Sequence, residues 1–308
     1  MSSPCFTLSD GRNIPALGLG TYKLTIEEAD DLIKFALLEA GYRHIDGAWI
    51  YGNERPIGQA VRSVIDSGKL KRDDIWITSK CWNDKHRQSQ VMDSCKESLA
   101  NFGLDYLDLF LIHWPMGYDN DPESGINKIS DVDYLETWKG MEDVYKAGLA
   151  KSIGVSNFTV SQLERLLANC SIKPTVNQIE VNPYFSNDDL VDYCKSQGIL
   201  VTCYSPLANV SRVEIVANHH DLSKDAHLIK IGAKYNKSWA QVALRYNYQR
   251  GLSIIPKTKS KQRLIENISI FDFQLTQQDM ETIKSINKNV RTITFDATKD
   301  HPLYPFER

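Results

Sequence analysis

The segment GYRHIDGAWIYGNE occupies residues 41–54 of the chain. It contains a strand candidate, residues 44–46, that ends in the carboxylate of Asp46, and the phenol of Tyr51 follows in the next loop. Each residue alone has an ordinary explanation, because an aspartate often forms a turn and a tyrosine often lies on a rim. The segment becomes informative because other strand candidates also end in reactive side chains.

Two later strand candidates end in this way. Residues 75–79 lead into Lys80, and residues 107–112 lead into His113. A free phenol has a pKa of about 10, but a nearby ammonium lowers that pKa, and a carboxylate can hold the ammonium in place. Alone, Lys80 fits a solvated strand end and His113 a core histidine. Together with the carboxylate and phenol of the first segment, they indicate a site for acid catalysis.

Short apolar runs alternate with amphipathic stretches along the whole chain. We expect eight strands, at residues 17–20, 44–46, 75–79, 107–112, 152–155, 176–178, 200–203 and 253–255. We expect helices at residues 26–39, 56–66, 88–101, 134–147, 160–169, 187–196 and 224–235. A hairpin at residues 6–15, turning at residues 9–12, precedes the first strand.

This alternation predicts parallel strands, because each helix must return the chain before the next strand begins. Eight such units close best as a barrel, although an open doubly wound sheet fits the same pattern. Chemistry in a barrel lies at the carboxyl ends of the strands, where Asp46, Lys80 and His113 fall. We therefore predict an α/β fold: a single (β/α)8 TIM barrel domain over residues 1–308, with an N-terminal β-hairpin and a C-terminal tail, residues 289–308, near the barrel mouth.

The composition is that of an ordinary globular chain and argues against several functions. Hydrophobic residues make up 42% and charged residues 24% of the 308 residues, and the net charge is −3. We therefore expect no nucleic acid or membrane partner, since such partners favour a strongly basic surface. No apolar stretch approaches the roughly 20 residues of a membrane span, and residues 1–6 do not begin a signal peptide.

The cysteines and histidines do not predict a metal centre. Six cysteines are scattered without CxxC or CxxxC spacing, which is typical of reduced, mostly buried thiols in a cytoplasmic protein. The adjacent His219 and His220 cannot both reach one metal from a helix, so a solvated loop is the better interpretation.

Four motifs in order carry a resemblance to a known family. Residues 41–58 match the pattern G-[FY]-R-x-x-D-x-A-x5-E-x3-G at every fixed position. The others are LIHWP at residues 111–115, GVSNF at residues 154–158 and IPKT at residues 255–258. In these motifs the chain resembles the aldo-keto reductase superfamily along its length, and in particular its aldose and aldehyde reductases.

The resemblance implies NADPH-dependent reduction of an aldehyde or ketone to an alcohol. Hydride would pass to the carbonyl carbon while Tyr51 protonates the oxygen. Lys80, paired with Asp46, would lower the pKa of Tyr51, and His113 would orient the carbonyl. A glutamate in place of His113 marks the relatives that reduce a steroid double bond, so the histidine favours carbonyl chemistry.

The same resemblance assigns the cofactor contacts. The nicotinamide would meet Ser156, Asn157, Gln178 and the ring of Tyr204. The basic and hydroxyl groups of Lys257, Thr258 and Arg263 suit a 2′-phosphate and favour NADPH over NADH. The remaining contacts would come from Gly20, Thr21, Asp46, Ser205, Leu207, Glu266 and Asn267.

Substrate would bind among aromatic side chains and the catalytic groups. The predicted substrate-binding residues are Tyr22, Trp49, Tyr51, Trp82, His113 and Trp114, with Phe295 or Tyr304 as additions from the tail. Among the departures from the family, Tyr22 stands where the aldose-reductase-like members have tryptophan, and Gly47 stands where a threonine or similar residue is usual. Ser211 stands about where relatives place an acid that clasps the cofactor, a role open to Glu214.

Two alternatives to a carbonyl reductase remain at this point. The first is a non-enzymatic NADPH-binding protein on the same barrel, like a lens crystallin or a channel subunit, since a fold does not dictate a function. The second is the same enzyme running toward alcohol oxidation. The intact Asp46, Tyr51, Lys80 and His113 set favours catalysis. We expect a cytoplasmic monomer acting on a small carbonyl compound.

Overall fold

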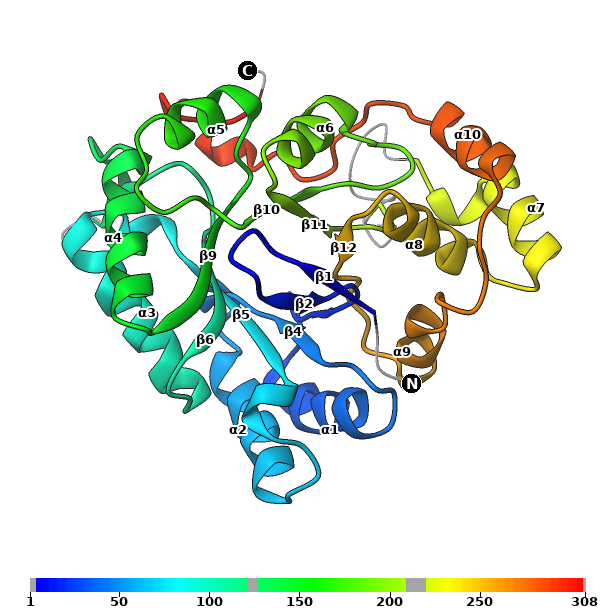
Figure 1. The fold of residues 1–308 in the computed structure, drawn as a ribbon, viewed down its shortest axis with the longest axis horizontal. Coiled ribbons are helices and arrows are strands. Elements are labelled where there is room, and N and C mark those ends of the chain that lie inside the picture. Colours follow the sequence, from blue (N-terminus) through cyan, green and yellow to red (C-terminus); the bar gives the residue numbers. More distant parts are fainter. Residues whose placement is uncertain (1–3, 121–126, 209–219, 307–308) are drawn as a thin grey trace.

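The computed structural model describes residues 4–120, 127–208 and 220–306. In these residues the main sheet has eight strands, all parallel to their neighbours, with helices arranged around it (Figure 1). The strands are β3 (Leu19–Gly20), β4 (His44–Asp46), β5 (Trp76–Cys81), β6 (Leu107–Ile112), β9 (Ala150–Ser156), β10 (Val176–Glu180), β11 (Leu200–Tyr204) and β12 (Ser253–Ile254). All eight predicted strands are present, with ends that shift by a few residues.

The sheet closes on itself, which confirms the barrel over an open doubly wound sheet. Its strands are paired in their order along the chain, with no reversal. The last strand then meets the chain just before the first: Leu17 bridges Ile254 in parallel, and Gly18 N donates to Ile254 O at 2.9 Å. A side chain at Gly20 would place Cβ 2.9 Å from Ile255 O, so glycine allows the close approach of the closing strands.

The helices form the outer layer around the strands (Figure 1). They are α1 (Ile26–Leu38), α2 (Glu54–Asp66), α3 (Gln88–Phe102), α4 (Tyr134–Lys146), α5 (Val160–Leu167), α6 (Asp188–Ser196), α7 (Ala226–Tyr235), α8 (Trp239–Gln249), α9 (Lys261–Ile268) and α10 (Gln277–Ser285). The seven predicted helices are confirmed, and α8, α9 and α10 were not predicted.

Local sequence explains where the first helix starts and which face it buries. Thr25 precedes α1, and its backbone N donates to the Glu28 carboxylate at 3.0 Å, which satisfies one of the donors left open at a helix start. Leu32, Ile33 and Ala36 are buried on the face that meets the barrel. Gly41 lies just beyond the helix with φ +85°, a conformation that glycine adopts at little cost.

The predicted N-terminal hairpin covers the amino-terminal end of the barrel. Strands β1 (Cys5–Thr7) and β2 (Asn13–Pro15) pair antiparallel and lie in front of the barrel in Figure 1, coloured dark blue. Ile14 is buried, and Asp10 Oδ2 accepts from Ser152 Oγ at 2.6 Å, near the start of β9. The predicted site lies at the opposite end of the barrel, where the strands finish.

The C-terminal tail reaches that opposite end, as predicted. The ring of Phe295 lies 5.2 Å from the ring of Trp114, which follows β6. Tyr304 is buried in the same apolar cluster, and its hydroxyl donates to Thr294 O at 2.5 Å. The tail therefore packs beside the barrel mouth.

Three further features of the structure can be compared with the predictions: a second hairpin, the state of the cysteines and the length of the helices. A hairpin of β7 (Tyr118–Asn120) and β8 (Asn127–Ile129) follows β6 and was not predicted. No disulfide joins any of the six cysteines, all of which lie in the described residues, and four of them are buried, as expected. Within the described ranges, no helix is both long and apolar enough to cross a membrane.

Candidate active site

A buried ion pair lies at the centre of the barrel mouth. Strands β4 and β5 are neighbours, so the ends of both strands bring Asp46 and Lys80 together. Lys80 Nζ lies 2.7 Å from Asp46 Oδ1 and donates to Gly47 O at 2.7 Å, and both side chains are buried. The second Asp46 oxygen accepts from Gln178 Nε2 at 2.7 Å. A buried pair needs such additional hydrogen bonds to offset its lost hydration.

Tyr51 lies beside this pair, on the short helix η1 (Trp49–Tyr51) that follows β4. Lys80 Nζ is 5.3 Å from the centre of its ring. Burial raises the pKa of Tyr51 well above its usual value, and the charge of Asp46 adds to this. The net direction is upward because burial is the largest cause, and the lowering of this pKa by Lys80 stays a prediction. At neutral pH the phenol is protonated, which is the state that a proton donor requires.

His113 stands on the other side of Tyr51, directly after β6. The two rings are 5.9 Å apart, with an angle of 77° between their planes. Burial lowers the pKa of His113 well below its usual value, and the nearby charge of Lys80 lowers it further. The imidazole is therefore neutral at neutral pH and can donate one N–H. Its backbone O accepts from Asn157 Nδ2 at 3.0 Å, which fixes the position of the residue.

The four predicted catalytic residues thus meet in one place. Two uncharged donors, the phenol of Tyr51 and the imidazole of His113, lie beside the Lys80–Asp46 pair. Donors held in place before the reaction stabilise negative charge that develops on a substrate oxygen. The arrangement can protonate and polarise a carbonyl oxygen.

The side chains predicted for the nicotinamide form a connected wall across three neighbouring strands. Ser156 Oγ donates to Gln178 O at 2.8 Å, and Asn157 Nδ2 donates to Ser156 Oγ at 3.1 Å. Tyr204 OH donates to Asn157 Oδ1 at 2.7 Å. The wall reaches the ion pair through Gln178, so it holds amide and hydroxyl groups and an aromatic ring at fixed positions near the catalytic residues.

The residues predicted for the 2′-phosphate lie in a basic group that also contains the carboxylate of Glu28. The pKa of Lys257 is lowered by the partial loss of hydration of its ammonium and by the charges of Lys259 and Lys23, and the charge of Glu28 opposes this. Lys259 pairs with Glu28 at 2.8 Å. Arg263 is exposed on the first turn of α9. Mutual repulsion of these cations would be relieved by an anion, so the residues fit a phosphate.

The other predicted cofactor residues also lie on this side of the barrel or beside it. Thr21 is buried and donates from Oγ1 to Asp46 O at 2.8 Å. Ser205 follows β11 with φ +46°. Thr258 and Asn267 are buried, whereas Leu207 and Glu266 are half-buried. Ser211 and Glu214, the two residues considered for a clasp, lie outside the described residues.

Aromatic side chains surround the catalytic residues. The ring of Trp82 is 5.0 Å from that of His113, and the ring of Tyr22 is 5.1 Å from that of Tyr51. Tyr22 is 55% exposed, so its ring forms an outer wall of the mouth. Phe295 contacts Trp82 from the tail, with 6.1 Å between the rings. These rings form an apolar surround for a carbonyl compound.

Trp49 is placed differently from the other predicted aromatic residues. Its Nε1 donates to Glu97 Oε1 on α3 at 2.7 Å. It lines a hollow with Ile26, Ile50 and Asn101, beside helices α2 and α3. Its role in substrate binding therefore stays a prediction.

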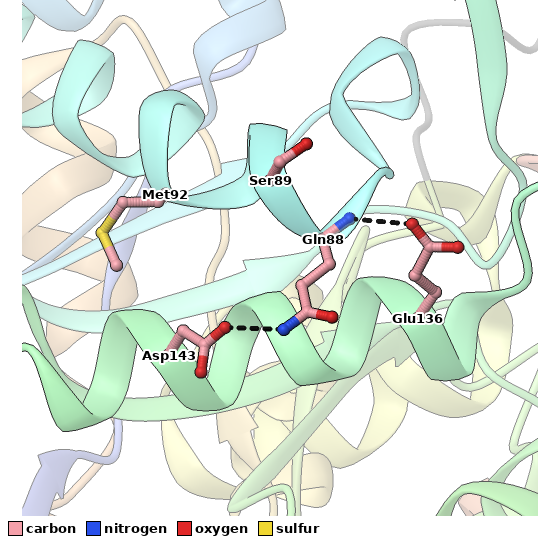
Figure 2. A pocket seen from close by; sticks show the side chains of 5 residues that line it. All are labelled: Gln88, Ser89, Met92, Glu136 and Asp143. Atoms are coloured by element: carbon pink, nitrogen blue, oxygen red, sulfur yellow. Dashed lines mark hydrogen bonds between the residues drawn. The ribbon is translucent and has the colours of Figure 1, made fainter.

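A second hollow, between α3 and α4, contains none of the predicted residues. Figure 2 shows its lining side chains: Gln88, Ser89, Met92, Glu136 and Asp143. Gln88 donates from its backbone N to Glu136 Oε1 at 3.1 Å and from Nε2 to Asp143 Oδ2 at 2.8 Å. Because these carboxylates already have partners on the surface of the helix layer, we assign no chemistry to this hollow.

One buried acid near the mouth was missed by the sequence analysis. Glu180 is the last residue of β10, two positions after Gln178, and is fully buried. Residues two apart in a strand share a face, so this spacing could have placed Glu180 toward the site. Its closest partners come from the tail, more than a hundred positions away in sequence, and no local pattern predicts that pairing.

The chain is similar to known proteins along most of its length. The model of the Aldo/keto reductase family matches residues 16–288. The aldo-keto reductase AKR2E4 of Bombyx mori is 44% identical over 312 residues, covering 99% of both chains. Aldose reductase B of Dictyostelium discoideum is 44% identical over 96% of each chain. The crystal structure of the Bombyx mori protein in complex with NADP superimposes with a TM-score of 0.93 and covers 99% of this chain and 100% of that one.

Proposed function

Because the chain belongs to the aldo/keto reductase family, we propose that it reduces aldehydes and ketones to alcohols with NADPH and that Tyr51 is the proton donor. It is an NADP-dependent oxidoreductase acting on carbonyl groups. Tyr51, His113 and the buried Lys80–Asp46 pair lie together at the barrel mouth, and this arrangement supports the proposed roles. A protein that only bound the cofactor would not require such a proton donor.

The side chains of this site suit the change in charge during reduction. When bound, NADPH supplies the hydride that the carbonyl carbon accepts. Negative charge then grows on the carbonyl oxygen, where the phenol of Tyr51 gives its proton and the neutral His113 donates a hydrogen bond. The product is the alcohol, and Tyr51 regains a proton from solvent. Lys80 stabilises the phenolate during this interval, and Asp46 and Gly47 O keep its ammonium in place.

The cofactor would lie between the connected wall and the basic group. Asn157 and Gln178 offer amide groups to a carboxamide, and Tyr204 offers a ring face for stacking. Ser156 completes that wall. The basic and hydroxyl groups of Lys257, Thr258 and Arg263 suit a dianionic 2′-phosphate, which distinguishes NADPH from NADH. Aldo-keto reductase AKR2E5, whose structure contains NADPH, is 42% identical with a TM-score of 0.93.

The basic group gives a direct test of cofactor preference. In Lys257→Met we expect the Kd for NADPH to rise about tenfold or more, because a charge-assisted contact to phosphate is lost, and the Kd for NADH to stay the same. Lys261→Met is the control, since Lys261 is a nearby lysine already paired with Asp31 at 2.8 Å. Equal weakening of both nucleotides would contradict the assignment.

Turnover itself is tested with the wild-type protein. Oxidation of NADPH is followed by absorbance with an aromatic aldehyde and with an aldose, and the alcohol product is identified by mass spectrometry. We expect one alcohol formed for each NADPH oxidised. Tight NADPH binding without turnover on any carbonyl would contradict a reductase and support a binding protein on the same barrel.

We also propose a monomeric, cytoplasmic protein. The six cysteines form no disulfide within the described residues, which suits a reducing compartment. The outer helices carry exposed ion pairs such as Lys34–Asp30, as expected for a solvated surface. Light scattering of the purified protein measures its mass directly, and a dimeric mass would contradict the first part of this proposal.

A further inference from the structure

Glu180 is a buried carboxylate at the mouth that has no part in the proton-donating set. It ends β10 on the same face as Gln178, whose amide reaches Asp46. The residue is fully buried, and burial raises the pKa of Glu180 while its hydrogen bonds oppose that rise. An acid in such a place requires donors around it.

One donor is local, since Asn182 Nδ2 lies 3.5 Å from Glu180 Oε1, and the closer donors come from the start of the C-terminal tail. Thr292 N lies 3.0 Å and 3.1 Å from the two carboxylate oxygens, and Ile293 N donates to Oε2 at 3.0 Å. The Thr292 hydroxyl also donates to Oε1. Two successive backbone N–H groups and a hydroxyl thus converge on one carboxylate, which holds the tail by its backbone.

The anchored segment carries side chains that face the substrate side of the mouth. Ile293 and Phe295 belong to the apolar cluster of Trp82 and Trp114. Phe295 packs against both indoles, and the ring of Trp82 lies 5.0 Å from His113. Phe295 also has φ +53°, a conformation that a bulky residue adopts only when its surroundings impose it. The anchor lies three residues or fewer from this ring along the chain.

The anchor also lies next to the wall predicted for the cofactor. Glu180 is opposite Tyr204 in the pairing of β10 with β11. The tail residue before the anchor, Arg291, stacks on the ring of Phe306 at 3.6 Å. One carboxylate therefore joins the tail, which packs on the aromatic residues of the mouth, to the strand ends that would hold the nicotinamide.

We propose that Glu180 is a positioning residue that sets substrate selectivity, by fixing the tail at Thr292 and Ile293 so that Phe295 closes the aromatic wall of the mouth. The selectivity for carbonyl substrates rests on the proposed function, whereas the hydrogen bonds between Glu180 and the tail exist whether or not the protein turns over a substrate. A large aromatic carbonyl would use the Phe295 wall, and a small aldehyde would not reach it.

Glu180→Gln tests the anchor. Glutamine has the same shape as glutamate, but its NH₂ group cannot accept a hydrogen bond from the Thr292 and Ile293 donors. Glu142→Gln is the matched control: Glu142 is a buried glutamate on α4 that accepts from Ser171 N at 2.6 Å and Ile172 N at 2.9 Å, in the outer helix layer. Both variants and wild type are compared with propanal and with naphthaldehyde, and their amide hydrogen exchange is measured by mass spectrometry.

We expect KM for naphthaldehyde to rise about tenfold in Glu180→Gln while kcat and the KM for propanal are retained, since hydrogen bonds to a charged group are lost only at the tail. Exchange of the Thr292 and Ile293 amides should accelerate about tenfold or more in this variant alone. In a Phe295→Ala background, Glu180→Gln should leave the naphthaldehyde KM unchanged, because the ring that the anchor places is gone.

Other results would overturn the proposal. Equal losses with both aldehydes would indicate a general structural role, as would the same change in Glu142→Gln. Unchanged exchange at Thr292 and Ile293 would show that Glu180 does not hold the tail. If wild type reduces no carbonyl, the proposed function fails, but the exchange measurement still decides whether the anchor exists.

Discussion

At the scale of single residues, the site combines one buried ion pair with two uncharged donors. Lys80 is fully buried, and burial lowers the pKa of its ammonium, whereas the charge of Asp46 opposes this. The pair keeps a positive charge close to Tyr51 without protonating His113, whose pKa is depressed. The stability of the fold and the proposed proton transfer therefore both depend on the contact between Lys80 and Asp46.

This dependence predicts the effect of Lys80→Met. Removing the ammonium leaves the Asp46 carboxylate buried without its cation, so we expect the free energy of unfolding to fall by about 3–5 kcal/mol. Lys34→Met is the control, because Lys34 pairs with Asp30 on the surface and should cost less than about 1 kcal/mol. Denaturant titration measures both, and equal losses would show that the buried pair is not special.

At the scale of elements, the helix that follows Tyr51 is packed tightly against its neighbour. Gly58 in α2 faces the end of α3, where an added Cβ would lie 2.2 Å from Phe102 O. We expect Gly58→Ala to destabilise the protein by about 1–3 kcal/mol, because backbone atoms must move apart. Ser63→Ala, at an exposed position of the same helix, should change stability by less than about 0.5 kcal/mol. A neutral Gly58→Ala would contradict this packing.

The elements also show what sequence patterns can and cannot predict. Most of the eight strands were predictable because they contain short apolar runs, buried on both faces of a parallel barrel. Helix α8 was missed because it follows α7 directly, with only residues 236–238 between them, so no strand separates the two patterns. The β7–β8 hairpin was missed because its strands are short and polar.

The site was predictable to the extent that its residues follow strand ends. Asp46, Lys80 and His113 each follow a recognisable apolar run, so their meeting is a consequence of the barrel. Two details required the structure. Burial dominates the pKa of Tyr51 and raises it, which the strand-end pattern does not reveal. The tail anchor at Glu180 depends on partners distant in sequence.

At the scale of the whole molecule, buried histidines predict how stability depends on pH. Burial lowers the pKa of His44 to about 4 and that of His86 to about 3. Below about pH 6.5 the unfolded chain takes up protons at these residues while the folded protein does not. The free energy of unfolding should therefore fall from pH 6.5 toward pH 4, by about 1.4 kcal/mol per pH unit for each such histidine.

A pair of variants isolates this effect. His86→Asn removes one buried histidine, so the slope between pH 6.5 and pH 4 should become shallower by about 1.4 kcal/mol per unit. His227→Asn, at an exposed position on α7, should leave the slope unchanged. Denaturant unfolding at several pH values gives both slopes, and identical slopes in wild type and His86→Asn would contradict the account.

The central claim is that this barrel is a carbonyl reductase with Tyr51 as its acid, and Tyr51→Phe tests it most directly. Tyr145→Phe is the matched control, since Tyr145 lies on α4 in the outer helix layer. NADPH oxidation with an aromatic aldehyde is measured alongside NADPH binding. We predict that Tyr51→Phe loses about 100-fold or more in kcat with binding retained, while Tyr145→Phe keeps its kcat. Full turnover in Tyr51→Phe would contradict the claim.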